Sequence, residues 1–232
     1  IIGFSEVMEQ QTFGPLGSPK YADYSAHIRS SGRHLLGIIC DVLDMSTLEA
    51  GRLTLVKTEF DLDAVVTSAF ESVKQEAQDK QIALFAENLP SANVRADREA
   101  IEKIIGKLVR NAVKFTPSGG RVSVRCRLMD GAVNVYVEDT GVGIPTDALS
   151  RIGRPFEQLN SPLQNGIKGS GLGLAIARSL AELHGGSLRI RSSVGAGTIV
   201  RIRLPIAASI WAPLQERARR SPPRQIHTDV AA

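Results

Sequence analysis

The chain has 232 residues, 43% of them hydrophobic and 5% aromatic, and a formal net charge of +4. It is long enough for one aliphatic core plus a smaller element, and its mild charge, with no basic face interleaved with aromatics, argues against nucleic-acid binding. No apolar run reaches the ~20 residues that span a bilayer, and the two cysteines have no metal-ligand or disulfide-framework spacing. We therefore expect a cytoplasmic segment without a membrane span. Because it opens with Ile1 rather than Met, we also expect sequence before it.

Residues 1–50 predict a helical hairpin whose first arm is short. Residues 1–9 have the pattern of the end of a helix, and the glycines and prolines of residues 14–19 predict a loop. Residues 20–50 predict a long helix, because they carry a heptad seam formed by Tyr24, Ile28, Ser31, Leu35, Ile38, Val42 and Met45. A second apolar stripe at Leu36, Ile39 and Leu43 widens this face, which implies more than one partner helix.

Residues 51–206 predict a two-layer α+β domain. A strand ending near Phe60 leads into a helix capped by Asp61, and residues 97–115 predict a second helix with one apolar face. Short strands are predicted over 82–86 and 93–96, and alternating apolar residues predict further strands over 121–128, 133–137, 187–192 and 198–204. Strands with one apolar face and helices to cover it describe a two-layer sandwich.

Between these elements, residues 140–170 are rich in glycine and show little periodicity. Connections of this length are uncommon unless they are functional. A helix over 171–184 follows and ends at Gly185, and its His184 would complement the helix dipole as a partly charged imidazole. Residues 207–232 predict a disordered basic tail.

Asp139 and the glycines after it form one candidate binding feature. An ionised carboxylate at the end of a buried strand can accept a hydrogen bond from an exocyclic amine such as that of adenine. Gly141 and Gly143 would let a flat base approach the backbone, and Ile144 could cover its face. A plain Asp-Thr-Gly turn explains the same residues if they are taken alone.

Two further features point to phosphate chemistry. Gly169, Gly171 and Gly173 open a predicted helix, where backbone amides and the helix dipole favour an anion. Asn111 and Lys114 share a helix face, and an amide oxygen can bind Mg²⁺ while an ammonium group neutralises phosphate. A Rossmann loop and a Walker A loop both fit poorly, because the strand before the glycines and the Gly-Lys-Ser/Thr sequence are missing.

Taken together, the features have a specific order. The chain reads NAVKFT at 111–116, DTGVGIP at 139–145, RPFEQ at 154–158 and GSGLGLAI at 169–176. These segments resemble the N, G1, F and G2 boxes of the sensor histidine kinases, and the resemblance extends over residues 1–205. It implies a Bergerat-type ATP-binding sandwich, preceded by a truncated helical hairpin of a dimerisation four-helix bundle.

The resemblance also implies roles for single residues. Asn111 would bind Mg²⁺, Lys114 would contact phosphate, Asp139 would bind the adenine amine, and residues 146–170 would form a mobile lid. The full set implied to bind the nucleotide is Asn111, Lys114, Phe115, Asp139, Gly141, Gly143, Ile144, Gly169, Gly171, Leu172, Gly173, Thr198 and Lys107. The implied partners are a second copy, through the hairpin, and the receiver domain of a response regulator.

The chain departs from the family pattern in two ways. Lys107 stands where the family often has a second asparagine, and no histidine follows the phosphoacceptor pattern. Residues 1–5 resemble the sequence just after the acceptor box, so we expect that this chain alone does not phosphorylate itself. Two alternatives stay open: an ATPase of the gyrase, heat-shock-chaperone and mismatch-repair type, and a non-catalytic dimerisation and docking module.

Overall fold

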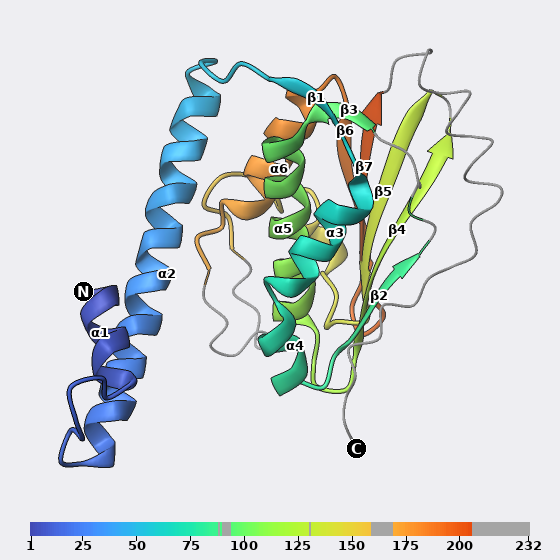
Figure 1. Cartoon of the computed structure of the whole chain (residues 1–232). Helices are drawn as coiled ribbons and strands as arrows, with labels where there is room; N and C mark the ends of the chain where they lie inside the picture. Colours follow the sequence, from blue (N-terminus) through green and yellow to red (C-terminus); the bar gives the residue numbers. More distant parts are fainter. Residues whose placement is uncertain (88, 90–93, 130, 159–168, 206–232) are drawn as a thin grey trace. The chain divides into compact units, whose positions relative to one another are not determined.

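The computed structural model of the chain describes residues 1–87, 89, 94–129, 131–158 and 169–205 (Figure 1). Residues 1–50 form one compact unit, and the residues from Gly51 onward form another. Among the described helices, none is long and apolar enough to cross a membrane. The predicted disorder of residues 207–232 concerns residues outside these ranges.

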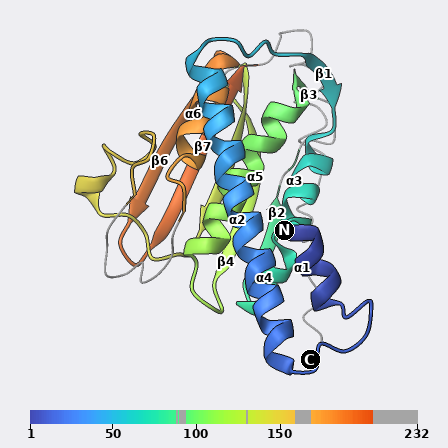
Figure 2. The same cartoon turned by 90° about the vertical axis from the view of Figure 1, so that its left-hand side faces the viewer.

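The first unit is a helical hairpin, as predicted. Helix α1 (Ile2–Glu9) lies alongside α2 (Pro19–Glu49), which begins with a proline in its first turn (Figures 1 and 2). Gly32 permits their close approach, since a Cβ there would lie 2.9 Å from Cγ1 of Ile2. Arg29 donates to Glu9 across the pair with a distance of 2.8 Å from Nη2 to Oε1. Much of the predicted apolar stripe remains exposed, including Leu35 and Leu43 at 58% and 62%.

The second unit contains a five-stranded mixed sheet of order β2-β4-β5-β7-β6. Its strands are β2 (Ala83–Glu87), β4 (Arg121–Met129), β5 (Ala132–Asp139), β6 (Ser187–Ser193) and β7 (Gly197–Pro205). β2 runs parallel to β4, and the other neighbouring pairs are antiparallel. Alternate residues of these strands face the core, as the predicted period of two requires: Val122, Val124, Val133, Val135 and Val137 are almost completely buried.

Helices cover one side of this sheet. They are α3 (Leu62–Glu71), α4 (Lys74–Asp79), α5 (Arg98–Phe115) and α6 (Gly173–Leu183), of which α5 and α6 pack directly on the strands (Figures 1 and 2). The predicted cap is confirmed, because the Asp61 carboxylate accepts a hydrogen bond from Asp63 N at 2.9 Å. The apolar face of α5, including Ile104 and Ile105, is fully buried. The α+β sandwich predicted from the sequence is therefore confirmed.

Three details differ from the sequence prediction. Helix α4 was not predicted, because it follows a break at Val73 and has only one buried residue, Ala77. The first strand, β1 (Lys57–Phe60), pairs with β3 (Val94–Asp97) in a separate two-stranded sheet. A short 3₁₀ helix, η1 (Thr146–Ala148), interrupts the glycine-rich region.

Candidate functional site

Asp139 is the last residue of β5 and is the one charged residue among the buried residues that the structure describes, with 9% of its surface exposed. Its Oδ1 accepts hydrogen bonds from Gly141 N at 2.8 Å and from Thr198 N at 3.2 Å. Burial raises the pKa of Asp139 to about 6, although the two backbone N–H groups act in the opposite direction. No described residue donates to Oδ2, so this oxygen is available to a ligand that carries a donor.

The loop after Asp139 is packed too closely for side chains at its glycines. A Cβ at Gly141 would lie 2.6 Å from both Asp139 Oδ1 and the Phe115 carbonyl oxygen. Gly143 has φ +72°, and a Cβ there would lie 2.0 Å from the carbonyl oxygen of Ser193. The loop is further fixed to the end of α5, because Val142 N donates to the Phe115 carbonyl at 3.2 Å. The backbone of the loop after Asp139 is therefore held in one conformation by its close packing.

A hydroxyl pair joins this loop to the last two strands. Ile144 N donates to Ser192 Oγ at 2.8 Å, and Ser192 Oγ lies 2.9 Å from Thr198 Oγ1. Gly197, with φ +95°, brings β7 against β5, since a Cβ there would lie 1.9 Å from the Asp139 carbonyl oxygen. Ser192 and Gly197 were missed from the sequence. Their signal was the Gly-x-Gly-Thr run over 195–198 that follows a serine-ended strand.

The C-terminal turns of α5 carry the predicted polar residues. Asn111, Lys114 and Phe115 are all partly exposed, and Lys114 Nζ lies 5.1 Å from the centre of the Phe115 ring. Burial lowers the pKa of Lys114 below its ordinary value. Lys80 was not predicted to take part, yet its Nζ donates at 3.0 Å to the carbonyls of Val113 and Lys114, which complements the C-terminus of this helix.

The start of α6 lies against this part of α5. A Cβ at Gly173 would lie 3.7 Å from Asn111 Nδ2 and 4.0 Å from Lys107 Cβ, and one at Gly169 would lie 2.7 Å from Lys114 Nζ. The N-cap residue, Leu172, is fully buried and supplies no capping side chain. The start of α6 and the glycine before it therefore lie next to the two lysines.

The RPFEQ segment also reaches the glycines before α6. Gly171 has φ +72°, and a Cβ there would lie 2.9 Å from the carbonyl carbon of Phe156. Gln158 Nε2 donates to the Gly169 carbonyl at 2.7 Å. Thus the structure brings all thirteen predicted site residues into one connected region at the C-terminal end of α5.

The first part of the predicted lid is a packed element. Ala148 and Ile152 are 2% and 9% exposed. Arg178 on α6 donates to the carbonyls of Ile152 and Gly153 at 3.3 and 3.5 Å. The sequence predicts one continuous lid over 146–170, but residues 146–153 are anchored on α6; residues 159–168 lie outside the described residues.

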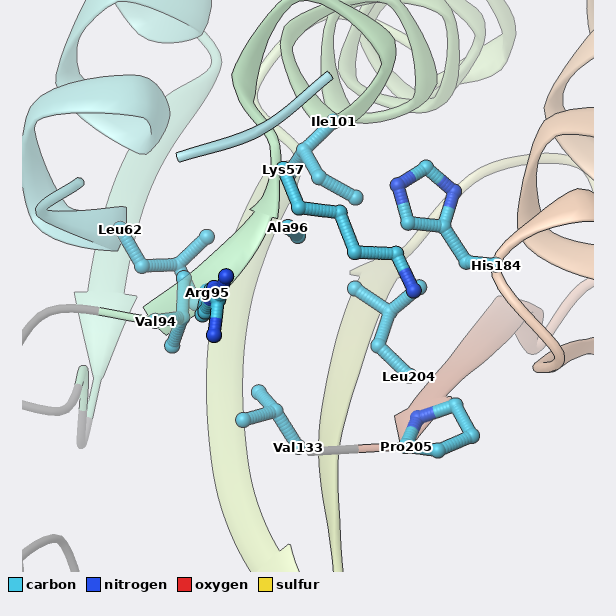
Figure 3. Close-up of a pocket in the computed structure, with 10 residues that line it drawn as sticks. All are labelled: Lys57, Leu62, Val94, Arg95, Ala96, Ile101, Val133, His184, Leu204 and Pro205. Atoms are coloured by element: carbon cyan, nitrogen blue, oxygen red, sulfur yellow. The ribbon is translucent and has the colours of Figure 1, made fainter. Parts of the chain in front are cut away.

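A separate pocket lies near the other end of α5 (Figure 3). Its lining includes Ile101, ten residues before Asn111, which corresponds to about 15 Å along a helix. His184 also lines it, where Nε2 accepts from Asp97 N at 3.2 Å and Nδ1 donates to the Leu180 carbonyl at 2.7 Å. The sequence predicts that this imidazole complements the helix dipole, and in the structure its two hydrogen bonds also join α6 to the start of α5.

Residues 96–208 match the family described as Histidine kinase-, DNA gyrase B-, and HSP90-like ATPase. Histidine protein kinase DivJ of Caulobacter vibrioides is 44% identical over 207 residues, which cover 89% of this chain and 34% of DivJ. The present chain therefore spans about a third of the length of that relative.

Solved structures of histidine kinases are also similar to this chain. Full-length ShkA, crystallised with AMPPNP, superposes with a TM-score of 0.72 at 29% identity, over 89% of this chain and 42% of ShkA. Histidine kinase ThkA, crystallised with the response regulator protein TrrA, gives a TM-score of 0.61 at 23% identity, over 88% of this chain and 56% of ThkA, and so supports the fold alone. The chain is thus homologous to the catalytic region of the two-component sensor histidine kinases, with an ATP-binding domain after a helical hairpin.

Proposed function

We propose that Asp139 recognises the adenine of ATP. Its Oδ1 is already held by two backbone amides, so the carboxylate is fixed in orientation before a ligand arrives. Oδ2 would accept from the exocyclic amine, and the glycines of the following loop would leave room for the ring. Thr198 and Ile144 border this position through the Ser192 hydroxyl.

The phosphates would lie between α5 and the start of α6. Lys114 and Lys107 supply positive charge there, and the uncapped amides of α6 supply donors. Asn111 is the one oxygen donor that the sequence assigns to Mg²⁺, and no cluster of three His, Cys, Asp or Glu side chains occurs among the described residues. This donor set fits an ion held mainly by phosphate oxygens and water, with one amide ligand. Such an ion would neutralise charge on the transferring group.

The proposed reaction is transfer of the γ-phosphoryl group of ATP to a histidine on a helical hairpin. The observation that carries it is the single region in which Asn111 and Lys114 lie beside the glycines at the start of α6, while the loop after Asp139 is bonded to the end of α5. The ATPase alternative needs a glutamate one helical turn before Asn111 to activate water. Lys107 occupies that position and cannot act as a base while it is protonated.

We further propose that the chain alone does not phosphorylate itself. His27 and His34 lie exposed on α2, away from any sequence of the acceptor pattern, and both ring nitrogens of His184 are engaged in hydrogen bonds. His227 lies outside the described residues. The acceptor would therefore be a histidine outside residues 1–232.

Two partners follow from this proposal. The exposed apolar stripe of α2, with Leu35 and Leu43, needs a partner helix, and a second copy of the hairpin supplies one in a four-helix bundle. ThkA was crystallised with a response regulator protein, and we propose a receiver domain of that kind as the next phosphoryl acceptor.

The test is phosphorylation in trans. The chain is incubated with γ-labelled ATP, alone and with a separately prepared helical hairpin that contains the acceptor histidine of a close relative. We expect acid-labile, base-stable label only on the added hairpin, and none when its acceptor histidine is replaced by glutamine. Release of inorganic phosphate without labelling would favour the ATPase alternative. Failure to label a folded hairpin, while ATP still binds, would indicate the non-catalytic module.

A further inference from the structure

The side of the five-stranded sheet that faces away from the helices is unusually basic, so the expectation from the sequence that no basic face is present was wrong. Outward positions of its strands carry seven arginines: Arg121, Arg125, Arg127, Arg189, Arg191, Arg201 and Arg203. The acidic residues at outward positions of the same strands are Glu87 and Glu138, which leaves this surface with a formal charge of +5 (seven minus two). We refer to these seven arginines as the arginine face.

The arginines are close neighbours across the strands. Arg201 of β7 lies directly opposite Arg189 of β6, and Tyr136 of β5 lies opposite Arg201 on the other side. Arg125 continues this row, 5.3 Å from the centre of the Tyr136 ring, and pairs with Glu138 at 3.0 Å. Like charges directly opposite each other on a sheet reduce its stability. The arrangement of Arg189 and Arg201 therefore has a folding cost that an anionic partner would offset.

The geometry of the arginine face selects the kind of partner. Outward side chains of one sheet stand on a common surface, with neighbouring strands about 4.8 Å apart and alternate residues about 7 Å apart. The arginines lie on three of the strands, at two or three positions along each strand. They therefore form a broad patch instead of a single row. A nucleic-acid strand would contact one track, whereas a planar anionic surface would contact the whole patch at once.

From this geometry we propose that the arginine face binds the surface of a membrane that contains anionic phospholipids. A second observation comes from the sequence that continues from β7. Residues 206–214 contain Ile206, Ile210, Trp211 and Leu214, and residues 217–224 contain four arginines. Apolar residues with tryptophan next to arginine are typical of segments that bind at the interface of anionic membranes. The residues proposed to bind the nucleotide lie on the other side of the sheet, with the helices, so membrane binding would leave them free to bind ATP.

The proposal is tested by co-sedimentation of the full chain with vesicles. We expect binding to phosphatidylcholine vesicles that contain about 30% phosphatidylglycerol at about physiological salt, loss of binding at about 1 M NaCl, and none to phosphatidylcholine alone. One arginine near such a surface contributes about a fivefold gain in partitioning. The variant R127Q/R189Q/R191Q/R201Q should therefore bind at least about a hundredfold more weakly.

A matched variant controls for net charge. K20Q/R33Q/R52Q/R98Q removes four exposed cations from other elements and should keep most of the vesicle binding. Both variants should bind ATP as the original chain does, which shows that they are folded. Equal loss in the two variants would overturn the proposal, and so would absent binding of the original chain. Binding to single-stranded DNA more tightly than to anionic vesicles would assign the face to nucleic acid instead.

Discussion

Replacing Asp139 with asparagine tests whether this residue binds adenine. We expect the substitution to weaken ATP binding but to increase the stability of the fold. Asparagine is close to aspartate in shape, and its amide oxygen can still accept from Gly141 N and Thr198 N. In that orientation its NH₂ group replaces Oδ2. A donor would then face the donor of the adenine amine.

The loss of binding can be estimated from this exchange. A hydrogen bond to a charged group contributes about 1.5–3 kcal/mol, and the mismatched donors add to its loss. We therefore expect Asp139→Asn to weaken ATP binding by about 2–4 kcal/mol, or roughly 30- to 1000-fold. Because only the ionised carboxylate accepts with both oxygens, ATP affinity of the original chain should fall as the pH is lowered through about 6.

The stability change has the opposite sign. Burial raises the pKa of Asp139 from 3.8 to about 6, so the folded state favours the protonated carboxyl. This contribution is fully present below about pH 4 and is lost as the pH rises through about 6. The difference corresponds to at most about 3 kcal/mol above that pH. The asparagine side chain carries no charge to bury, so the variant should unfold at higher urea concentration than the original chain at about pH 8, with a smaller difference at about pH 5.

Isothermal titration with a non-hydrolysable ATP analogue measures the binding change, and urea denaturation without nucleotide measures the stability change. Asp147→Asn is a matched control, because Asp147 is an exposed carboxylate near the site, and it should leave both quantities unchanged. Unchanged affinity in Asp139→Asn would refute the adenine assignment. Reduced stability together with reduced affinity would show that Asp139 mainly holds the loop.

Three further substitutions test other parts of the account. Gly143→Ala should destabilise the domain by more than about 2 kcal/mol in thermal denaturation and abolish ATP binding, because its Cβ would lie 2.0 Å from the carbonyl oxygen of Ser193. Gly195→Ala is the control: this glycine has a similar φ but open space around it, so the substitution should destabilise the domain by only about 1 kcal/mol. Lys107→Ala should weaken the binding of Mg·ATP about tenfold, measured by calorimetry, but leave the binding of adenosine unchanged. Equal effects on both ligands would exclude a contact between Lys107 and phosphate. His184→Phe should lower the free energy of unfolding, measured in urea, by about 1–3 kcal/mol, because the N–H of Asp97 loses its hydrogen-bond acceptor. An unchanged free energy of unfolding would show that the hydrogen bond from Asp97 N to His184 does not contribute to stability.

Most of the fold could be predicted because its pattern is local. The alternating valines of β4 and β5 and the apolar face of α5 each follow from periodicity within a single element. The cap at Asp61 has an equally local signal. The separate pairing of β1 with β3 did not follow, because the two strands are more than thirty residues apart and neither has more than four residues.

In the candidate site, too, residues in local motifs could be predicted and residues that depend on distant contacts could not. Asp139 and the glycines could be named from sequence because each lies in a short motif. Ser192 and Lys80 could not, since their roles depend on contacts with Ile144 and with the carbonyl end of α5, which are distant in sequence. The hydrogen bonding of His184 likewise depends on Asp97, which lies 87 residues away.

The most direct test of the central claim is to locate ATP on the domain by NMR. The ¹H–¹⁵N spectrum of the labelled chain is followed during titration with Mg²⁺ and AMPPNP. The structure predicts that the largest shifts occur at the amides of Gly141, Gly143, Gly173 and Thr198, with smaller ones along the last turn of α5. Shifts concentrated at Lys57, Ile101 and His184 would place the nucleotide in the pocket of Figure 3 and contradict the assignment of this site.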